Sequence, residues 1–194
     1  MSNEDLIQGS EAWFSARLGV ITASRLADIM KKTKYNESTY KTRLRFQLAI
    51  ERVSGKSASD TVMNKAMHDG VEREPDARNL FEAISASPDG IIRGENAVLE
   101  LKCPTHITHA KNLLSDTMPS NYIYQVQWQI ACTESDYAYF ASYHPDYPKE
   151  LRLKWMRVER DDKVIKSLEE AVRQFDIEIE DLIIKLKKGA TTDG

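Results

Sequence analysis

The chain has 194 residues, 41% of them hydrophobic, and no Pro/Gly/Ser-rich linker or repeat divides it, so its length suits one domain with a hydrophobic core. A formal net charge of -3 does not exclude DNA binding, because the distribution of charge matters more than its sum. Two cysteines, Cys103 and Cys132, exclude a disulfide framework and a four-cysteine iron–sulfur site, and no apolar run suits a signal peptide or a membrane span. We therefore expect a single cytoplasmic domain over residues 1–194, with a flexible tail at 189–194.

The first elements are predicted to be two short helices. Ser10 is a favourable N-cap for a helix that ends near Arg17, and Thr22 or Ser24 is a favourable N-cap for a helix to about Lys32. A helix N-terminus presents free backbone N–H groups and a positive dipole, so Ser24, with Arg17 nearby, could hold a terminal phosphate. Helix capping alone explains the same hydroxyl without any ligand.

Basic and aromatic residues alternate in the next segment. The basic ones are Lys31, Lys32, Lys34, Lys41, Arg43 and Arg45, and the aromatic ones are Tyr35, Tyr40 and Phe46. This composition suits contacts with DNA phosphates and with sugar or base faces. A solvated basic helix face explains it equally well.

Apolar residues at helical spacing predict two longer helices, over 40–53 and 61–82. Pro75 predicts a kink or a break in the second of them. Glu72 and Glu74 are two positions apart on this helix and face different ways, so only one of them is expected to reach a metal site. From spacing alone, either glutamate is more often a surface charge.

Residues 98–102 have the pattern of a short apolar strand that carries two charges. Because strand side chains alternate between faces, Glu100 and Lys102 are expected on one face, with Leu99 and Leu101 on the other. An acid and a lysine in this arrangement are commonly a solvated pair.

Asp89 lies in the turn sequence Ser87-Pro88-Asp89-Gly90, which predicts a hairpin that brings its carboxylate beside Glu100. Two neighbouring carboxylates repel unless a cation lies between them, and oxygen ligands favour Mg²⁺ or Mn²⁺ over zinc. The Leu101 carbonyl could add an oxygen, and Lys102 could orient the attacking water or stabilise the transition state. Together these residues favour a metal-dependent nuclease, although a Pro-Asp-Gly sequence alone is commonly only a turn.

The remaining elements are a helix over 120–132, strands over 137–143 and 151–159, and a long amphipathic helix from Asp161 to Gly189. Gln127 borders the apolar stripe of the first of these helices, where glutamine usually satisfies a backbone group. A carboxamide near metal ions could also orient water or phosphate. No paired metal-ligand spacing suggests a zinc site among the four histidines, His68, His106, His109 and His144.

Several motifs follow one another in a fixed order along nearly the whole chain. They are Trp13, Arg17 to Ser24, Gly70, Glu74, Asp76-Ala77-Arg78, Ser87-Pro88-Asp89-Gly90, Leu99 to Pro104, Gln125-Val126-Gln127 and Tyr139-Phe140-Ala141. This series resembles the lambda exonuclease (YqaJ-type) family of phage recombination nucleases, in the PD-(D/E)XK superfamily. The resemblance implies a mixed α/β fold with a central mixed β-sheet flanked by helices and a restriction-endonuclease-like core.

The resemblance assigns a role to each member of the expected active site. Asp89 and Glu100 would be the main metal ligands, and Glu74 would help to hold a second ion. Lys102 would be the catalytic base or water-orienting residue. Of the glutamines, the resemblance favours Gln127 beside the metals.

A second group of residues would recognise the end of the DNA. By the resemblance, Arg17, Ser24 and Ser87 would form a pocket for the 5′-phosphate. Family members carry a longer segment with an extra hairpin before the Ser-Pro-Asp-Gly turn. Either this chain lacks that hairpin, or a loop is missing between Ala83 and Ile84, and the second explanation is our hypothesis.

The resemblance implies a Mg²⁺-dependent exonuclease, with two ions per site and Mn²⁺ able to substitute. It would digest one strand of double-stranded DNA 5′ to 3′ from a 5′-phosphorylated end, releasing mononucleotides and leaving a 3′ overhang. A toroidal homotrimer, a single-strand annealing protein as partner and a phage or prophage origin in a bacterial host are further implications. Two alternatives stay open, namely a structure-specific or restriction-type endonuclease and a non-catalytic DNA-binding recombination scaffold.

Overall fold

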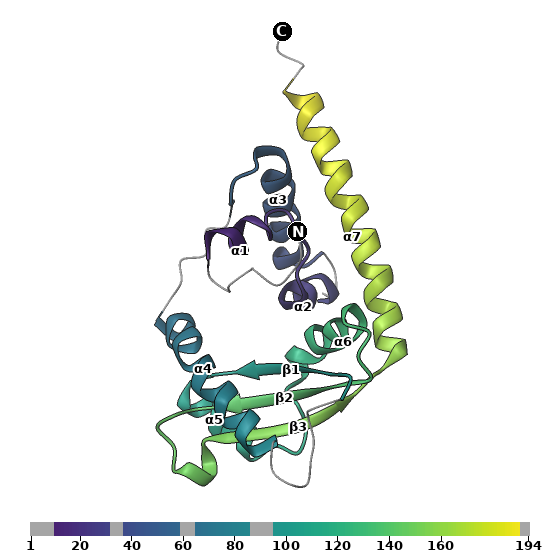
Figure 1. Cartoon of the computed structure of the whole chain (residues 1–194). Coiled ribbons are helices and arrows are strands. Elements are labelled where there is room, and N and C mark those ends of the chain that lie inside the picture. Colours follow the sequence, from purple (N-terminus) through teal and green to yellow (C-terminus); the bar gives the residue numbers. More distant parts are fainter. Residues whose placement is uncertain (1–9, 32–36, 59–64, 86–94, 191–194) are drawn as a thin grey trace. The chain divides into compact units, whose positions relative to one another are not determined.

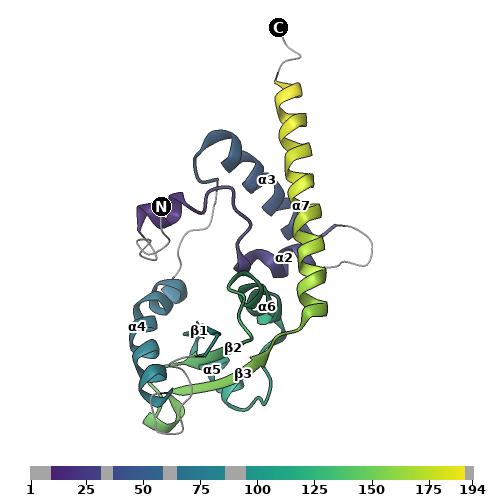
Figure 2. The same cartoon turned by 45° about the vertical axis from the view of Figure 1, so that its right-hand side comes forward.

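A computed structural model describes residues 10–31, 37–58, 65–85 and 95–190. The chain forms two compact units, one made of Met1–Asp60 with Lys166–Gly194 and the other of Thr61–Ile165. Figures 1 and 2 show their elements from two directions. Within the described residues, no helix has the length and apolar character needed to cross a membrane.

The first unit begins with short helices. They are α1 (Glu11–Ser15), the 3-10 helix η2 (Ala23–Arg25) and α2 (Leu26–Met30). Ser10 caps α1 as expected, because its hydroxyl accepts a hydrogen bond from the Trp13 N–H at 3.1 Å. The expected cap of the second helix is absent at Thr22, whose hydroxyl instead bonds to that of Ser24 at 3.2 Å.

Two longer helices complete the first unit. They are α3 (Thr39–Ser54) and α7 (Asp162–Gly189), of which the residues from Lys166 onward belong to this unit. Both helices bury apolar residues, namely Leu44, Leu48 and Ala49 of α3 and Leu168, Phe175, Ile179 and Ile183 of α7. The apolar spacing in the sequence predicted both helices correctly.

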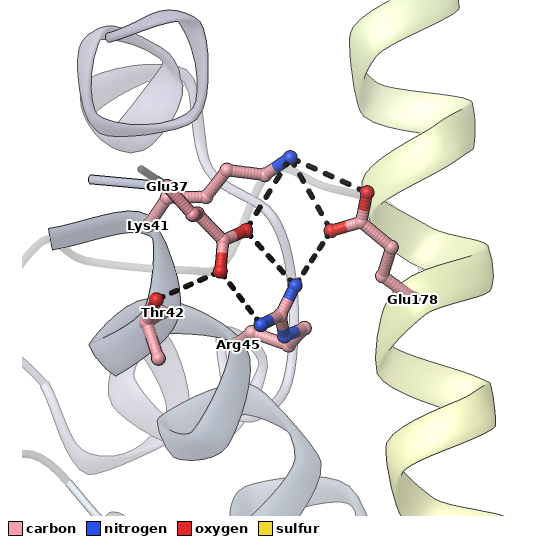
Figure 3. A network of polar contacts seen from close by, with 5 residues as sticks. All are labelled: Glu37, Lys41, Thr42, Arg45 and Glu178. Carbon is pink, nitrogen blue, oxygen red and sulfur yellow. Dashed lines mark hydrogen bonds and ion pairs between the residues drawn. The ribbon is translucent and has the colours of Figure 1, made fainter. Parts of the chain in front are cut away.

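Ion pairs join α3 to α7 (Figure 3). Arg45 binds Glu178 at 2.9 Å and Glu37 at 2.8 Å, and Lys41 binds Glu178 at 3.3 Å. Two members of the basic segment, which DNA contact and a solvated helix face explained equally well, therefore have carboxylate partners within the protein. For Lys41 and Arg45 this placement favours a structural role over the DNA contact.

The second unit contains a mixed β-sheet. In the described residues its strands are β1 (Ala97–Lys102), β2 (Tyr137–Tyr143) and β3 (Leu153–Glu159), in the order β1-β2-β3. β1 runs parallel to β2, and β2 runs antiparallel to β3. The second unit also contains the helices α4 (Lys65–Ser85), α5 (His106–Leu113) and α6 (Ile123–Cys132) and the 3-10 helices η3 (Ser120–Tyr122) and η4 (Lys149–Leu151). The expected α/β fold with a mixed sheet is confirmed.

Each face of the sheet packs against a different helix. Ala138 and Phe140 of β2 pack with Val126 and Ile130 of α6. The alternate residues of β2 pack with Phe81 of α4, and Leu99 and Leu101 of β1 lie against this second cluster. The alternation of the strands therefore places Glu100 and Lys102 on the α6 face, as the sequence predicted.

Helix α4 is continuous. Pro75 lies inside it, so of the two predicted outcomes, a kink or a break, the break does not occur. The helix also passes through Ala83 and Ile84 to Ser85, which makes these two residues consecutive members of one helix and contradicts the hypothesis of a missing loop. The predicted hairpin of Asp89 lies outside the described residues.

Candidate active site

Glu100 lies in the middle of β1 with its side chain directed toward α6, and only 7% of the residue is exposed. Three nitrogen donors surround its carboxylate. Lys102 Nζ lies 2.5 Å from Oε1, Gln125 Nε2 lies 2.6 Å from Oε1, and Gln129 Nε2 lies 2.6 Å from Oε2. A buried carboxylate is costly unless such partners compensate the loss of water, and this cluster fixes the orientation of Glu100.

Lys102 and Gln125 are also bonded to each other. The Lys102 ammonium donates to Gln125 Oε1 at 3.5 Å and lies 5.0 Å from the centre of the Tyr122 ring. Lys102 is partly exposed, with 27% of its side chain accessible to solvent. The pair that the sequence placed on one strand face is therefore a close ion pair with one buried member and one member that reaches solvent.

Gln129 has an unusual environment. Its Nε2 group donates to Glu100. Its Oε1 is buried and has no hydrogen-bond partner among the described residues. Rotating the amide by half a turn would place Oε1 against the Glu100 carboxylate, which repels it, so Glu100 determines the orientation. An acceptor with a free lone pair thus lies directly beside the carboxylate.

Gln127, the glutamine favoured by the resemblance, does not lie beside Glu100. Its Nε2 donates to the Glu159 carbonyl at 2.7 Å, and its Oε1 accepts the Asp161 N–H at 2.8 Å. It is 1% exposed and joins α6 to the segment between β3 and α7. The reason is helical geometry, because residues two apart on a helix face different ways.

Gln125 and Gln129 are therefore the residues that the sequence reasoning missed. They are four positions apart on α6, so they share one helix face and reach the same carboxylate. That spacing was visible in the sequence, but their common partner on β1 was not.

Glu74 lies on α4, near the end of β1. Its carboxylate contacts Arg78 at 3.4 Å. Burial, together with the nearby charge of Glu74, raises the pKa of the Cys103 thiol to about 11, so this thiol is protonated at neutral pH and is a poor metal ligand. The structure thus places Glu74 near the residue that follows β1, and it places Leu101 on β1 with its side chain in the opposite core cluster.

The predicted phosphate-binding residues are distributed over different parts of the chain. Arg17 belongs to the first unit, where its guanidinium stacks 4.2 Å from the centre of the Trp13 ring. Burial and the neighbouring Arg25 lower the pKa of Arg17. Ser24 is exposed in η2, beside Arg25. Ser87 and Asp89 lie outside the described residues.

The Glu100 carboxylate is an oxygen ligand of the type that Mg²⁺ prefers. Lys102, Gln125 and Gln129 direct nitrogen donors at this carboxylate and hold its orientation, and these nitrogens are not metal ligands. The buried, unpartnered Gln129 Oε1 adds an acceptor that can bind a metal-coordinated water. A cation held by the Glu100 carboxylate would lie next to the Lys102 ammonium.

Comparisons with known proteins show which family and fold the chain shares. The model of the YqaJ-like viral recombinase domain matches residues 12–85 and 81–136. Two crystal structures of the alkaline exonuclease LHK-Exo from Laribacter hongkongensis are similar to this chain, one of them in complex with dAMP. Their identities are 31% and 32% and their TM-scores 0.83 and 0.84, and each alignment covers 95% of this chain and 100% of the other.

A phage-related exonuclease from Haemophilus somnus 129PT shares the fold at 16% identity, with a TM-score of 0.63 over 86% of this chain and 96% of the other. Among curated protein sequences, none matches significantly. The family match spans more than half of the chain, and the LHK-Exo structures match it almost throughout. The chain therefore belongs to the YqaJ-like viral recombinase family.

Proposed function

We propose that this protein is a Mg²⁺-dependent exonuclease that digests one strand of double-stranded DNA from the 5′ end. The observation that carries the proposal is the buried carboxylate of Glu100, which Lys102, Gln125 and Gln129 hold in a protein whose solved structural neighbours are exonucleases. The coarser conclusion, a nuclease of phage-type recombination, rests on the family itself. The metal, the polarity and the strand choice belong to the proposal.

Different residues of the proposed site would bind the metal, orient the attacking water and position these groups. Glu100, with Asp89 and the Leu101 carbonyl, would bind Mg²⁺, and Glu74 would help to bind a second ion. Bound Mg²⁺, or Mn²⁺ in its place, supplies a water of lowered pKa and compensates negative charge on the attacked phosphate. Lys102 would orient that water and stabilise the transition state, because its ammonium already lies beside the ligand carboxylate. Gln125 would hold the side chains of Lys102 and Glu100 in their relative positions through its hydrogen bonds to both.

The 5′ polarity requires recognition of the DNA end. Arg17, Ser24 and Ser87 are the residues proposed for a 5′-phosphate pocket, and Arg17 keeps its positive charge at neutral pH because guanidinium groups do not deprotonate in proteins. The dAMP complex of LHK-Exo supports mononucleotides as products, since dAMP is a deoxynucleoside monophosphate. Digestion would leave a 3′ overhang.

The assembly is a separate part of the proposal. A ring-shaped homotrimer around the DNA would prevent dissociation between cleavage events, and a single-strand annealing protein would bind the strand that digestion exposes. Both parts rest on the resemblance of the sequence to the lambda exonuclease family. Sedimentation of the purified chain, with and without DNA, tests whether the homotrimer forms.

The test of the activity uses linear duplex DNA labelled at the 5′ or the 3′ end, with and without 5′-phosphate, in Mg²⁺ or EDTA. Closed circular DNA is the control. We expect early release of mononucleotides from phosphorylated 5′ ends, only in Mg²⁺, with the circles intact. Cleaved circles would indicate an endonuclease instead, and the absence of cleavage would indicate a DNA-binding scaffold.

The assignment of Lys102 has its own test. Lys102→Ala should abolish cleavage but leave DNA binding measurable, whereas Lys163→Ala, which removes an exposed lysine of α7, should cleave normally. Retained cleavage in Lys102→Ala would remove this residue from the mechanism. Asp89→Ala should lose metal binding together with activity.

A further inference from the structure

Three potential metal ligands from separate parts of the second unit converge at one end of the sheet. His106 begins α5, whereas His144 and Asp146 follow β2. His106 Nε2 lies 3.4 Å from Asp146 Oδ2, His144 Nδ1 lies 3.9 Å from the same oxygen, and all three ligand atoms lie within 4.8 Å of one another. We propose that His106, His144 and Asp146 bind a transition-metal ion of the Zn²⁺ class.

The spacing of these atoms fits that coordination. Bonds of about 2.0 to 2.1 Å in a tetrahedral site place neighbouring ligand atoms about 3.3 Å apart. The distance from His106 Nε2 to Asp146 Oδ2 is already within 0.1 Å of this value. The His144 Nδ1 atom must move about half an ångström closer to Asp146 Oδ2 to reach it. Three protein ligands leave a fourth position for water.

The chemical class of the ligands separates this site from the one at Glu100. Two imidazoles and one carboxylate suit Zn²⁺, Co²⁺ or Ni²⁺, whereas Mg²⁺ favours sites made of oxygen atoms. A cation of the Zn²⁺ class is therefore expected at His106, His144 and Asp146 even when Mg²⁺ is in large excess. This inference does not depend on the proposed nuclease activity.

The backbone around the site is ordered before a metal binds, and one of the three ligands is buried in it. His144 is 1% exposed, and its N–H donates to the Arg152 carbonyl at 2.9 Å. Tyr147 donates through its hydroxyl to the His106 carbonyl at 2.9 Å, and Arg152 Nε donates to the Tyr147 carbonyl at 2.9 Å. The rings of His106 and His144 lie against each other, with their centres 3.9 Å apart, so the exposed His106 ring must swing outward for both nitrogens to bind one ion. The buried His144 loses little conformational freedom on binding, whereas the ion itself orders His106 and Asp146.

Two neighbours oppose the metal. The Asp146 N–H donates to His144 Nδ1 at 3.4 Å, so this hydrogen bond must break before Nδ1 binds an ion. Arg73 Nη1 lies 3.3 Å from His144 Nε2, and a metal on Nδ1 leaves the ring proton on Nε2, where it faces this donor. Asp69, 3.8 Å from Arg73 on the same helix, offers the guanidinium another partner. Replacement of Arg73 by glutamine should therefore strengthen metal binding, because an amide oxygen can accept the Nε2 proton.

A second group of potential ligands provides the control. His68, Asp69 and Glu72 also lie within ligand distance of one another, but all three belong to one helix, α4. They supply one imidazole, whereas the proposed site supplies two, one of them on the buried His144. His68→Ala should therefore leave the binding almost unchanged.

The experiment measures metal binding to the full chain after removal of metals with a chelator. Co²⁺ titration followed by its visible absorption reports the geometry, and Zn²⁺ competition and calorimetry give the affinity. We expect one tight site that excess Mg²⁺ does not displace, and an increase in Tm with Zn²⁺ because binding stabilises the folded state. His106→Ala and Asp146→Ala change exposed side chains, so they avoid the risk that a His144 variant fails to fold.

The variants decide between the possible sites. His106→Ala and Asp146→Ala should each weaken binding by more than the roughly 10- to 100-fold that loss of an outer-shell partner costs. Binding that survives both substitutions, that disappears in His68→Ala or that requires Glu100 would overturn the proposal. The absence of Co²⁺ or Zn²⁺ binding to the unmodified chain would overturn it as well.

Discussion

Gln129 donates a hydrogen bond of 2.6 Å to Glu100 Oε2, while its own Oε1 is buried without a partner in the described part of the chain. The contact ties the second turn of α6 to the middle of β1. It therefore couples the orientation of a proposed metal ligand to the packing of a helix, and it leaves an acceptor for a water or a hydrated ion.

Replacement of Gln129 should impair metal binding more than folding. In Gln129→Met the side chain keeps its volume but loses the donor to Glu100, so the carboxylate is no longer held in one orientation. We expect the Mg²⁺ concentration for half-maximal cleavage to rise by roughly 10- to 100-fold, as for loss of an outer-shell partner of a metal site. The measurement is a Mg²⁺ titration of cleavage rate, with denaturant midpoints as the control for folding.

Gln127 should behave in the opposite way. Gln127→Ala leaves the Glu159 carbonyl and the Asp161 N–H without their partner, which should cost about 1 to 3 kcal/mol of unfolding free energy. Cleavage per folded molecule should stay unchanged. Urea denaturation and cleavage assays on the same sample separate the two effects, and a loss of cleavage without a loss of stability would instead support the metal-site role implied by the resemblance.

Glu178 should contribute a salt-dependent part of the stability. It accepts from Lys41 and Arg45 of α3, and its side chain is 23% exposed. Glu178→Gln should therefore lower the unfolding free energy by about 1 kcal/mol in low salt and by less in high salt. Glu170→Gln, at an exposed position of the same helix, is the matched control. Equal effects of the two substitutions at both salt concentrations would exclude this role of Glu178.

Two glycines with positive φ allow a matched comparison. Gly19 has φ +68° and a Cβ there would lie 2.6 Å from Arg52 Cγ, whereas Gly55 has φ +64° and open space around it. Gly55→Ala should cost about 1 to 2 kcal/mol from the backbone conformation alone. Gly19→Ala should cost more, because Arg52 must also shift from its hydrogen bond to the Gly19 carbonyl. Equal costs in thermal or urea unfolding would show that Arg52 moves freely.

His109 should make the stability depend on pH. Burial, opposed by the hydrogen bond to the Leu151 carbonyl and aided by His106, lowers the pKa of His109 in the folded state. The unfolded state therefore binds more protons as the pH falls below about 6.5, so the contribution of neutral His109 is present above that pH and is lost below it. His109→Gln should weaken this dependence in urea unfolding between pH 5 and 8, and an unchanged dependence would contradict the prediction.

The sequence by itself determined the local elements and one essential piece of geometry. The apolar spacing predicted α3 and α7, and β2 has the predicted bounds. Alternation along β1 placed Glu100 and Lys102 on the same face, because period-two geometry is a property of any strand. These features depend on neighbours a few positions apart, so they can be read from one segment.

Only the tertiary structure decided which partners these side chains choose. Gln125 and Gln129, rather than Gln127, face Glu100 because α6 packs on β1 with one particular rotation. The basic residues Lys41 and Arg45 pair with Glu178, more than 130 positions away in the sequence. Long-range packing sets these contacts, since the rotation of a helix and the meeting of distant charges depend on the whole fold and not on local propensity.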